Sequence, residues 1–416
     1  MYLAEGVKNA RLSGGTLRRI ATGNVLALGL TSLFTDVSSE MVSAVLPAYL
    51  VLGLHLSISQ YGVLDGLYTG STAFTRLLGG YLADRFRRRK VVALVGYGLS
   101  AVAKIGLLGT ADVPSAVGAV IVADRTGKGV RTAPRDALIA SSVDGRDLGQ
   151  AFGVHRAMDS VGAFLGPLAA LGLLLLASSE GYRAVFVGSL CAAVVGLVVL
   201  ALFVREGQPD RSLHPAPDPD PDPERGLRVR RLLAAGTFRR LCVVAALLGL
   251  ATVGDGFVYL VLQDRDDLPV RAFPLLAVGT SLAFLVLAVP LGRLADRLGR
   301  WPVVVTGYGC LLAVYLLLSS GAGPIWLVLA LYGAFYAATD GVLVALAVPL
   351  VPEHLRTTGL ALLQTGQALA YVVSSVVFGL LWQHVGVQTA CLTAAGVAAL
   401  LLPFCALLLR GTRRVA

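Results

Sequence analysis

The sequence predicts an all-α integral membrane protein with twelve transmembrane helices in two pseudo-symmetric six-helix bundles. The first observation behind this prediction is composition, since 56% of the 416 residues are hydrophobic and only 14% are charged. A soluble protein with so few charged residues could not cover its surface. The second observation is a short charged segment, flanked by apolar runs, that occurs once in each half of the chain. We therefore expect a membrane protein built by duplication.

The duplicated segment reads GYLADRFRRRK at 80–90 and GRLADRLGR at 292–300. Each copy follows one apolar run of about 20 residues and precedes another, so each is expected at a membrane surface. Its glycine would permit close helix approach, its aspartate would accept hydrogen bonds, and its arginines would pair with carboxylates or lipid phosphates. Residues that only fixed the topology would not need the shared G-x-L-A-D-R core.

Apolar runs of about 20 residues are long enough to cross a bilayer. They predict twelve spans, at 22–52, 58–83, 91–111, 114–140, 150–177, 184–204, 238–262, 270–291, 301–320, 323–350, 357–383 and 387–409. The first six spans form a bundle over 1–204, and the last six form a bundle over 238–416. The segment between them, 205–237, contains alternating Pro and Asp, which can neither form a helix interior nor bury apolar area, so we expect an extended cytoplasmic linker.

The formal charge of +10 comes from Lys and Arg in short segments between apolar runs. We interpret these residues as topology determinants and not as a nucleic-acid-binding surface. One side of the predicted membrane collects nearly all of them, and the other keeps only Arg183, Arg265 and Arg271. The positive-inside rule then places both termini in the cytoplasm, with the chain in a bacterial plasma (inner) membrane. The N-terminus lacks the short apolar core and cleavage site of a signal peptide.

The fourth span carries an unusual density of charge. At 100° per residue, Arg125, Lys128, Arg131 and Arg135 fall within one stripe roughly 120° wide that also contains Asp124. Each charge facing lipid would cost about 2.5–3.5 kcal/mol, so the stripe must face a water-filled cavity or paired carboxylates. Arg125, Lys128 and Arg131 are therefore candidates for solute binding or charge relay. An interfacial position is the alternative for Arg131 and Arg135.

Four acidic residues are candidates for proton coupling. Asp36 and Glu40, at i and i+4 of the first span, share one helical face, and two close carboxylates raise each other's proton affinity. Aligning the two halves by their apolar pattern places Asp255 near the position of Asp36, and Asp340 opposite Lys128. A static ion pair with a cation of the fourth span is the alternative for Asp36 and Glu40.

The duplicated segment resembles the signature loop of the major facilitator superfamily, which lies between helices 2 and 3 and recurs in weaker form between helices 8 and 9. Arg87 stands where the family usually has glycine, whereas the second copy keeps Gly299. The resemblance implies the superfamily fold and a loop that latches the outward-open state with the help of an arginine on helix 4. The implied gating residues are Gly80, Asp84, Arg85, Arg88, Arg135, Asp296, Arg297 and Arg300.

Two further motifs are similar to superfamily patterns. Arg125 with Gly129 resembles the helix-4 motif, whose arginine is tied to proton transfer in the family. Gly162, Gly166 and Pro167 in the fifth span resemble an antiporter motif that goes with export in exchange for protons, although the closing glycine pair is missing. The glycines and the proline of the fifth span allow close packing and a bend, so we expect a helix-5 hinge there. The runs at 35–41 and 127–137 look like those of a poorly characterised bacterial subgroup.

The predicted function is alternating-access secondary transport, namely proton-coupled antiport that exports a small organic solute. Uptake of an organic anion by the cations of the fourth span is one alternative, and a non-transporting membrane receptor or scaffold is another. The expected partners are the solute, protons and membrane lipids, with the chain acting as a monomer. We expect no enzyme activity, metal or cofactor, since the proton gradient would supply the energy. Few aromatic residues are expected along the cavity helices.

Overall fold

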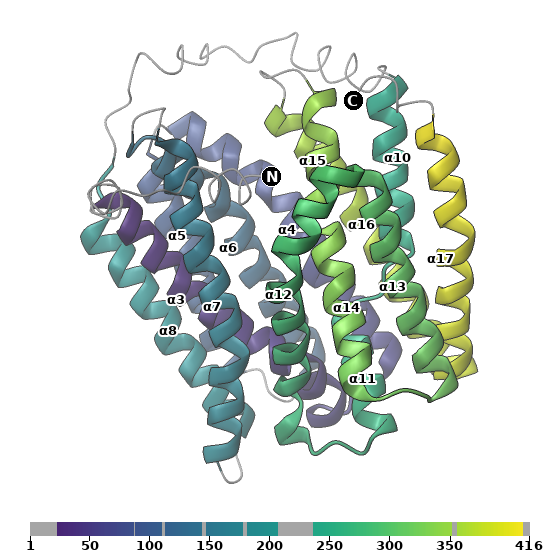
Figure 1. Cartoon of the computed structure of the whole chain (residues 1–416). Helices are drawn as coiled ribbons and strands as arrows, with labels where there is room; N and C mark the ends of the chain where they lie inside the picture. The colour runs from purple at the N-terminus through teal and green to yellow at the C-terminus, as the bar shows by residue number, and fades with distance from the viewer. Residues whose placement is uncertain are drawn as a thin grey trace.

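Helices account for nearly all of the described chain, which comprises residues 23–86, 88–109, 113–143, 147–177, 181–206, 236–351 and 356–410 of a computed structural model. Side chains are described for these residues except at positions 74, 76–86, 356–358 and 409–410. No strand occurs within the described ranges. The prediction of an all-α fold with two six-helix bundles is confirmed (Figure 1). Of the predicted linker at 205–237, residues 207–235 lie outside the described residues.

The first bundle contains six helices close to the expected spans. They are α3 (Asn24–Ala48, continued by the π-helical turn η1, Tyr49–Gly53), α4 (Ile58–Phe86), α5 (Arg89–Gly109), α6 (Pro114–Ala140), α7 (Leu148–Leu176) and α8 (Gly181–Phe203). Helix α3 packs against α7 and α8, and α6 packs against α4 and α5. The Asn24 side-chain amide donates hydrogen bonds to Ser142 Oγ (3.1 Å) and Arg205 O (2.8 Å). The start of α3 is thereby tied to the residues that follow α6 and α8.

The second bundle repeats this plan with two interrupted spans. Its elements are α10 (Gly236–Leu250), α11 (Asp255–Arg265), η2 (Val270–Ala272), α12 (Pro274–Leu298), α13 (Arg300–Ser320), α14 (Ile325–Thr339), α15 (Val342–Ala347), η3 (Val348–Leu350), α16 (Arg356–Val385) and α17 (Val387–Arg410). Helix α10 packs against α16, and α14 packs against α12 and α13. The expected seventh and tenth spans are found in place, and each is interrupted, between α10 and α11 and between α14 and α15.

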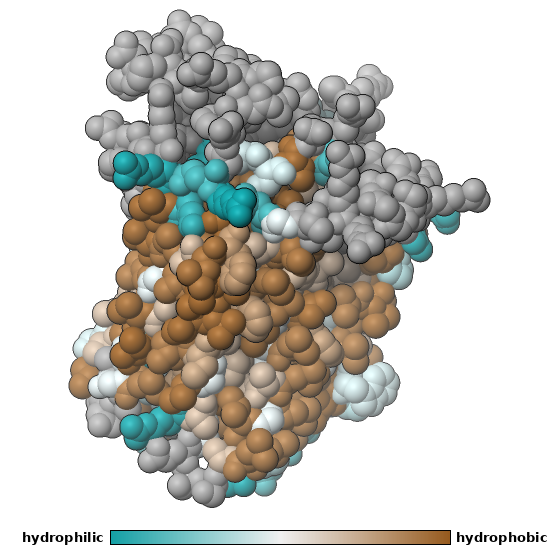
Figure 2. Space-filling model, turned by 90° about the vertical axis from the view of Figure 1, so that its left-hand side faces the viewer, coloured by the Kyte–Doolittle hydropathy of each residue, from teal (hydrophilic) through white to brown (hydrophobic). Residues whose placement is uncertain are grey.

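Ten of the twelve helical spans in the described chain are long and apolar enough to cross a membrane. Helices α4 and α6 are not among these ten. On the outer surface, large apolar side chains such as Leu176 (85% exposed) and Leu202 (72% exposed) face outward. Figure 2 shows one side of the molecule, where a broad apolar belt separates polar residues at the two ends. Such a belt fits the hydrocarbon core of a bilayer.

The two bundles meet where α4 packs along α16 and α7 packs along α12 (Figure 1). We call the end where α4 and α8 finish and α10 begins the linker face, and the other end the opposite face. Near the opposite face, a Cβ atom at Gly62 would lie 2.7 Å from the carbonyl oxygen of Ser375, and one at Gly379 would lie 2.8 Å from that of Ile58. Glycine is therefore required for the backbones of α4 and α16 to touch here.

Four residues separate the end of α10 from the start of α11. The backbone groups of this buried gap lack helical partners, and tyrosine hydroxyl groups form hydrogen bonds with them. The Val253 N–H donates to Tyr315 Oη (2.8 Å), which in turn donates to the Ala251 carbonyl (3.0 Å). Tyr332 Oη donates to the Val253 carbonyl at 3.0 Å. Irregular backbone at membrane depth is tolerated only where protein groups or a cavity satisfy it. At the break in the tenth span, Gly341 adopts a positive φ of 73°, which favours glycine.

We predict that Tyr315→Phe destabilises the second bundle by about 2–4 kcal/mol, because it leaves a buried N–H and a buried carbonyl without partners. The measurement is denaturant unfolding of the purified protein in detergent. Tyr308→Phe is the matched control, since Tyr308 is equally buried and its hydroxyl bonds only to Thr252 Oγ1, at 3.3 Å. Equal losses for the two variants would contradict the role assigned to Tyr315.

Candidate functional site

A cavity of about 600 Å³ lies between the two bundles. This volume is within the range of about 300–1,000 Å³ typical of small-molecule sites. Helices α3, α4 and α6 line it from the first bundle, and α10, α11, α13, α14, α15 and α16 line it from the second. Tyrosine side chains contribute from both bundles, so the expectation of few aromatic residues along the cavity is wrong. The aromatic lining residues are Tyr61, Tyr68, Tyr308, Phe335, Tyr336 and Tyr371.

Five of the seven predicted coupling and relay residues line this cavity: Glu40, Arg125, Lys128, Asp255 and Asp340. Glu40 lies in the electrostatic field of Lys128 and Arg125, and also in that of Asp36 and Asp255. Lys128 has Asp36 and Glu40 as its acidic neighbours. The first-bundle wall therefore carries both signs of charge.

Asp36 and Arg131 are not among the cavity-lining residues. Asp36 faces α7, where a Cβ atom at Gly162 would lie 3.2 Å from the Asp36 Cβ. The Arg131 guanidinium is buried and stacks on the Tyr97 ring, 4.4 Å from its centroid. Its Nη1 atom has no hydrogen-bond partner within the described part of the chain. Neither residue lines the cavity, but the charge of each acts on Lys128, which does.

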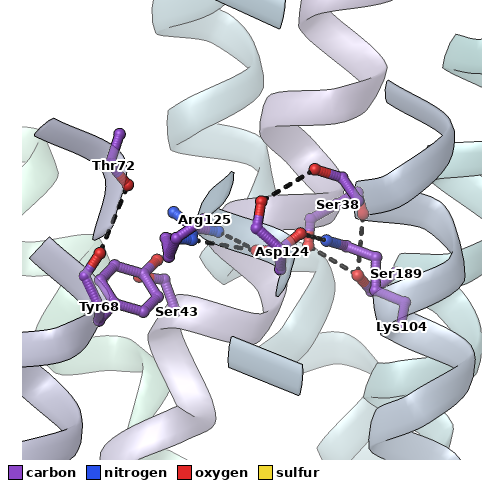
Figure 3. Close-up of polar contacts among 9 residues, drawn as sticks. Ser38, Ser43, Tyr68, Thr72, Lys104, Asp124, Arg125 and Ser189 are labelled. Carbon is purple, nitrogen blue, oxygen red and sulfur yellow. Dashed lines mark hydrogen bonds and ion pairs between the residues drawn. The ribbon is translucent and has the colours of Figure 1, made fainter. Parts of the chain in front are cut away.

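Asp124 connects two buried cations behind the cavity wall (Figure 3). Lys104 Nζ, on α5, donates to Asp124 Oδ1 at 2.6 Å. Arg125 donates to Asp124 Oδ2 through Nη2 and through Nε, the latter at 3.0 Å. The other side of the Arg125 guanidinium lies over the Tyr68 ring, 4.1 Å from its centroid. The Tyr68 hydroxyl shares a 3.0 Å hydrogen bond with Ser43 Oγ.

Lys104 was missed by sequence reasoning. The sequence did contain an indication of its importance, because a lysine within an apolar span usually belongs to a functional site or to an ion pair. The partner could not be read from the spacing, since Lys104 and Asp124 lie on different helices. Lys104 therefore shares the Asp124 carboxylate with Arg125, so that this one acidic group serves two buried cations of the first bundle.

Arg135 lies towards the linker face and pairs with its neighbour Asp136, with Nη2 donating to Oδ1 at 2.9 Å. Its Nη1 also reaches Ser32 Oγ at 3.5 Å. The same Ser32 hydroxyl bonds to His155 Nε2 at 2.8 Å, and His155 Nδ1 lies 3.5 Å from Asp159 Oδ2. A polar network thus joins α3, α6 and α7 beside the predicted gate.

The predicted gating loop is described only in part. Gly80, Asp84 and Arg85 belong to the last turns of α4, but their side chains lie outside the described set, and Arg88 is exposed. In the second copy, Asp296 and Arg297 are exposed. Arg300 Nη1 donates to the Ala345 carbonyl at 2.6 Å, which ties the second loop to the interrupted tenth span. The latch between Asp84 and Arg135 stays a prediction.

The predicted helix-5 hinge lies at the contact between α7 and α3. A Cβ atom at Gly162 would lie 2.6 Å from the Leu33 carbonyl oxygen, and one at Gly166 would lie 2.6 Å from the Glu40 Cβ. Pro167 lies inside α7, which is assigned as helix from Leu148 to Leu176. These glycines therefore let α7 approach α3 directly behind Glu40.

Asp65 on α4 joins the two bundles and was also missed by sequence reasoning. Its Oδ2 atom accepts a hydrogen bond from Tyr371 Oη of α16 at 2.7 Å and lies 2.7 Å from Ser375 Oγ, whose single proton is shared between Asp65 Oδ2 and the Gly62 carbonyl oxygen (2.8 Å). Next to this contact, the Phe257 ring packs edge-on against Tyr61 and Phe378, with centroid distances of 4.8 and 4.9 Å. The Asp65 carboxyl group and an aromatic cluster thus join the bundles towards the opposite face.

Comparisons with known proteins agree with this geometry. The family model for the Major Facilitator Superfamily matches residues 28–280 and 241–416. An uncharacterised MFS-type transporter of Methanocaldococcus jannaschii is 32% identical over 377 residues, which cover 86% of this chain and 88% of that protein. In fold, the chain resembles the nucleoside transporter NupG (TM-score 0.75, 13% identity, 94% and 100% covered). It also resembles a D-xylose–proton symporter (TM-score 0.72, 15% identity, 92% and 96% covered).

We predict that Asp124→Ala destabilises the protein by about 3–5 kcal/mol, because it leaves the buried charges of Lys104 and Arg125 without their shared carboxylate. Denaturant unfolding in detergent measures this loss. The control is Asp136→Ala on the same helix, where the carboxylate side chain is 42% exposed and the expected loss is about 1 kcal/mol or less. A loss at Asp124 no larger than the control would contradict the pairing.

We predict that Tyr371→Phe and Ser375→Ala together loosen the contact between α4 and α16, because Asp65 loses both inter-bundle donors. Spin labels at two exposed sites near the opposite face, one on each bundle, would report a larger population of long distances by double electron–electron resonance. Thr393→Ala, whose hydroxyl bonds only within α17, is the control. An unchanged distance distribution in the double variant would exclude Asp65 as a gate contact.

Proposed function

The chain belongs to the Major Facilitator Superfamily of secondary transporters, and we propose that it exports a small organic solute by proton-coupled antiport. Alternating access requires one central site and two gates. The cavity between the bundles is the candidate site. The contacts of Asp65 with α16 supply one gate, and the duplicated loops at the linker face are candidates for the other.

Glu40 carries the proposal of proton coupling. A coupling carboxylate must reach the cavity, so that it can exchange its proton with whichever side of the membrane the cavity faces. Glu40 lines the cavity in the field of the Lys128 cation. It also lies where α7 touches α3, at Gly166. A change in its charge would therefore act both on the solute site and on the packing of a helix that borders the other bundle.

The alternative of organic-anion uptake receives less support from the geometry. It relies on the cations of α6 being available to the solute. Arg125 is held by Asp124 and Tyr68, Arg131 does not line the cavity, and Arg135 pairs with Asp136. Lys128 alone of these four cations lines the cavity without an ion pair to another described residue.

We predict that an inward proton gradient accelerates solute release from the interior of oriented cells or vesicles by about tenfold or more, and that Glu40→Gln abolishes this response because it cannot carry a proton. Right-side-out vesicles loaded with a defined mixture of small organic solutes, followed by mass spectrometry, identify which solute moves. Asp264→Asn is the control, because Asp264 is exposed and does not line the cavity.

Equal transport rates with and without the gradient would contradict proton coupling. Uptake in place of release would reverse the assigned direction. If no solute moves in the wild-type protein while it stays folded and monodisperse, the receptor or scaffold alternative gains support.

A further inference from the structure

We infer that the transported solute is a small organic cation, bound between the Asp255 carboxylate and the tyrosine rings of the second bundle. This inference rests on the proposed function, since it names the class of solute that the central cavity accepts. The expected charge of the solute is thus opposite to that of an organic anion bound by the cations of the fourth span.

The charges that line the cavity are unequal in number. Within the described residues, the lining contains four carboxylates, Glu40, Asp65, Asp255 and Asp340, and two cations, Arg125 and Lys128. Both cations belong to the first bundle. The lining contributed by the described part of the second bundle has acidic residues and no basic ones.

The two lining cations are compensated where they stand. Arg125 shares Asp124 with Lys104 and stacks on Tyr68. Lys128 has Asp36 and Glu40 as acidic neighbours. The first-bundle wall is thus close to neutral overall, and an anionic solute would find its cations already engaged.

Asp255 lacks such compensation. It sits at the break before α11, where its Oδ1 atom accepts a hydrogen bond from the Gly256 N–H at 2.9 Å. No basic side chain of the described chain lies within ion-pair distance of it, and its exposed surface faces the cavity. A carboxylate deep in the protein with only a backbone donor gains strongly from a mobile cation that enters the cavity.

Asp340, on the same wall of the cavity, is a less favourable cation-binding site than Asp255. It lies at the second break, exposed to the cavity, and its nearest acting cation is Arg156 of α7. Arg156 belongs to the other bundle and is exposed. The charge of Arg156 therefore acts on Asp340, whereas no described cation acts on Asp255 in this way, and we assign Asp255 as the main cation site.

Aromatic side chains line the same cavity as this carboxylate. Tyr336 and Tyr371 lie within the electrostatic range of Asp255, and both line the cavity together with Tyr308 and Phe335. Tyrosine faces attract organic cations, and quaternary ammonium groups in particular are recognised by such rings. An acidic group among aromatic rings selects a cation with apolar substituents over a strongly hydrated inorganic ion.

This solute class also fits exchange for protons. A carboxylate can be compensated by a proton or by a cationic solute, and binding of one disfavours the other. Asp255 and Glu40 lie in each other's electrostatic field, so protonation at either site weakens attraction for a cation between them. The exchange then needs no covalent step.

The test uses thermal unfolding of the purified full chain with three matched probes: benzyltrimethylammonium, neutral benzyl alcohol and anionic benzoate. We expect benzyltrimethylammonium alone to raise the melting temperature, by roughly 3 °C or more at saturating concentration. Asp255→Asn should weaken its apparent affinity at least tenfold. Asp264→Asn, on the same helix but outside the cavity lining, should leave the affinity unchanged. Asparagine can still accept the Gly256 N–H bond, and an unshifted melting temperature without probe confirms that the variant folds.

Stabilisation by benzoate and not by the cation would overturn the inference, as would a cation effect that is equal in Asp255→Asn and the wild type. No stabilisation by benzyltrimethylammonium, choline or tetraethylammonium would also count against it. Transport in vesicles separates the two proposals. Asp255-dependent cation binding without proton-driven release leaves this inference standing and contradicts antiport, whereas proton-driven release of a neutral or anionic solute does the opposite.

Discussion

The buried carboxylate of Asp124 is the interaction on which the rest of the site depends. A lysine and an arginine inside an apolar bundle are each costly, and Asp124 lowers this cost for both by accepting hydrogen bonds from Lys104 and Arg125. Because this group lies behind the cavity wall, the arginine is fixed in place against Tyr68. The charges left to act on a solute are then those of Glu40, Lys128 and the second bundle. The cavity therefore differs in sign from what the composition of α6 alone suggests.

The two bundles solve the same problem of polarity within a membrane in different ways. The first keeps continuous helices and compensates side-chain charges within itself. The second interrupts its seventh and tenth spans and satisfies the freed backbone with the hydroxyls of Tyr315 and Tyr332. Each interruption places an aspartate, Asp255 or Asp340, on the cavity wall. Duplication thus produced similar helix positions with complementary chemistry.

Much of the fold follows from the sequence, because apolar run length and the position of charges report directly on membrane crossing. The same signals located Glu40, Arg125, Lys128, Asp255 and Asp340, all of which line the cavity. They could not pair Lys104 with Asp124 or Asp65 with Tyr371, since such contacts join helices whose relative rotation is set by packing. The helix breaks were missed because glycine, unlike proline, is compatible with a continuous helix, and the tyrosines that satisfy the gap lie more than fifty residues away.

Tyr371 links the solute site to the gate. Its ring lines the cavity in the field of Asp255, while its hydroxyl donates to Asp65 across the bundle interface. A solute that draws Tyr371 towards Asp255 removes a donor from Asp65, which leaves that buried carboxylate with fewer hydrogen bonds and weakens the contact between α4 and α16. An empty cavity has no such effect. Tyr371 is therefore the side chain through which occupancy of the central site would act on the contact at the opposite face, as the differential contact that alternating access requires.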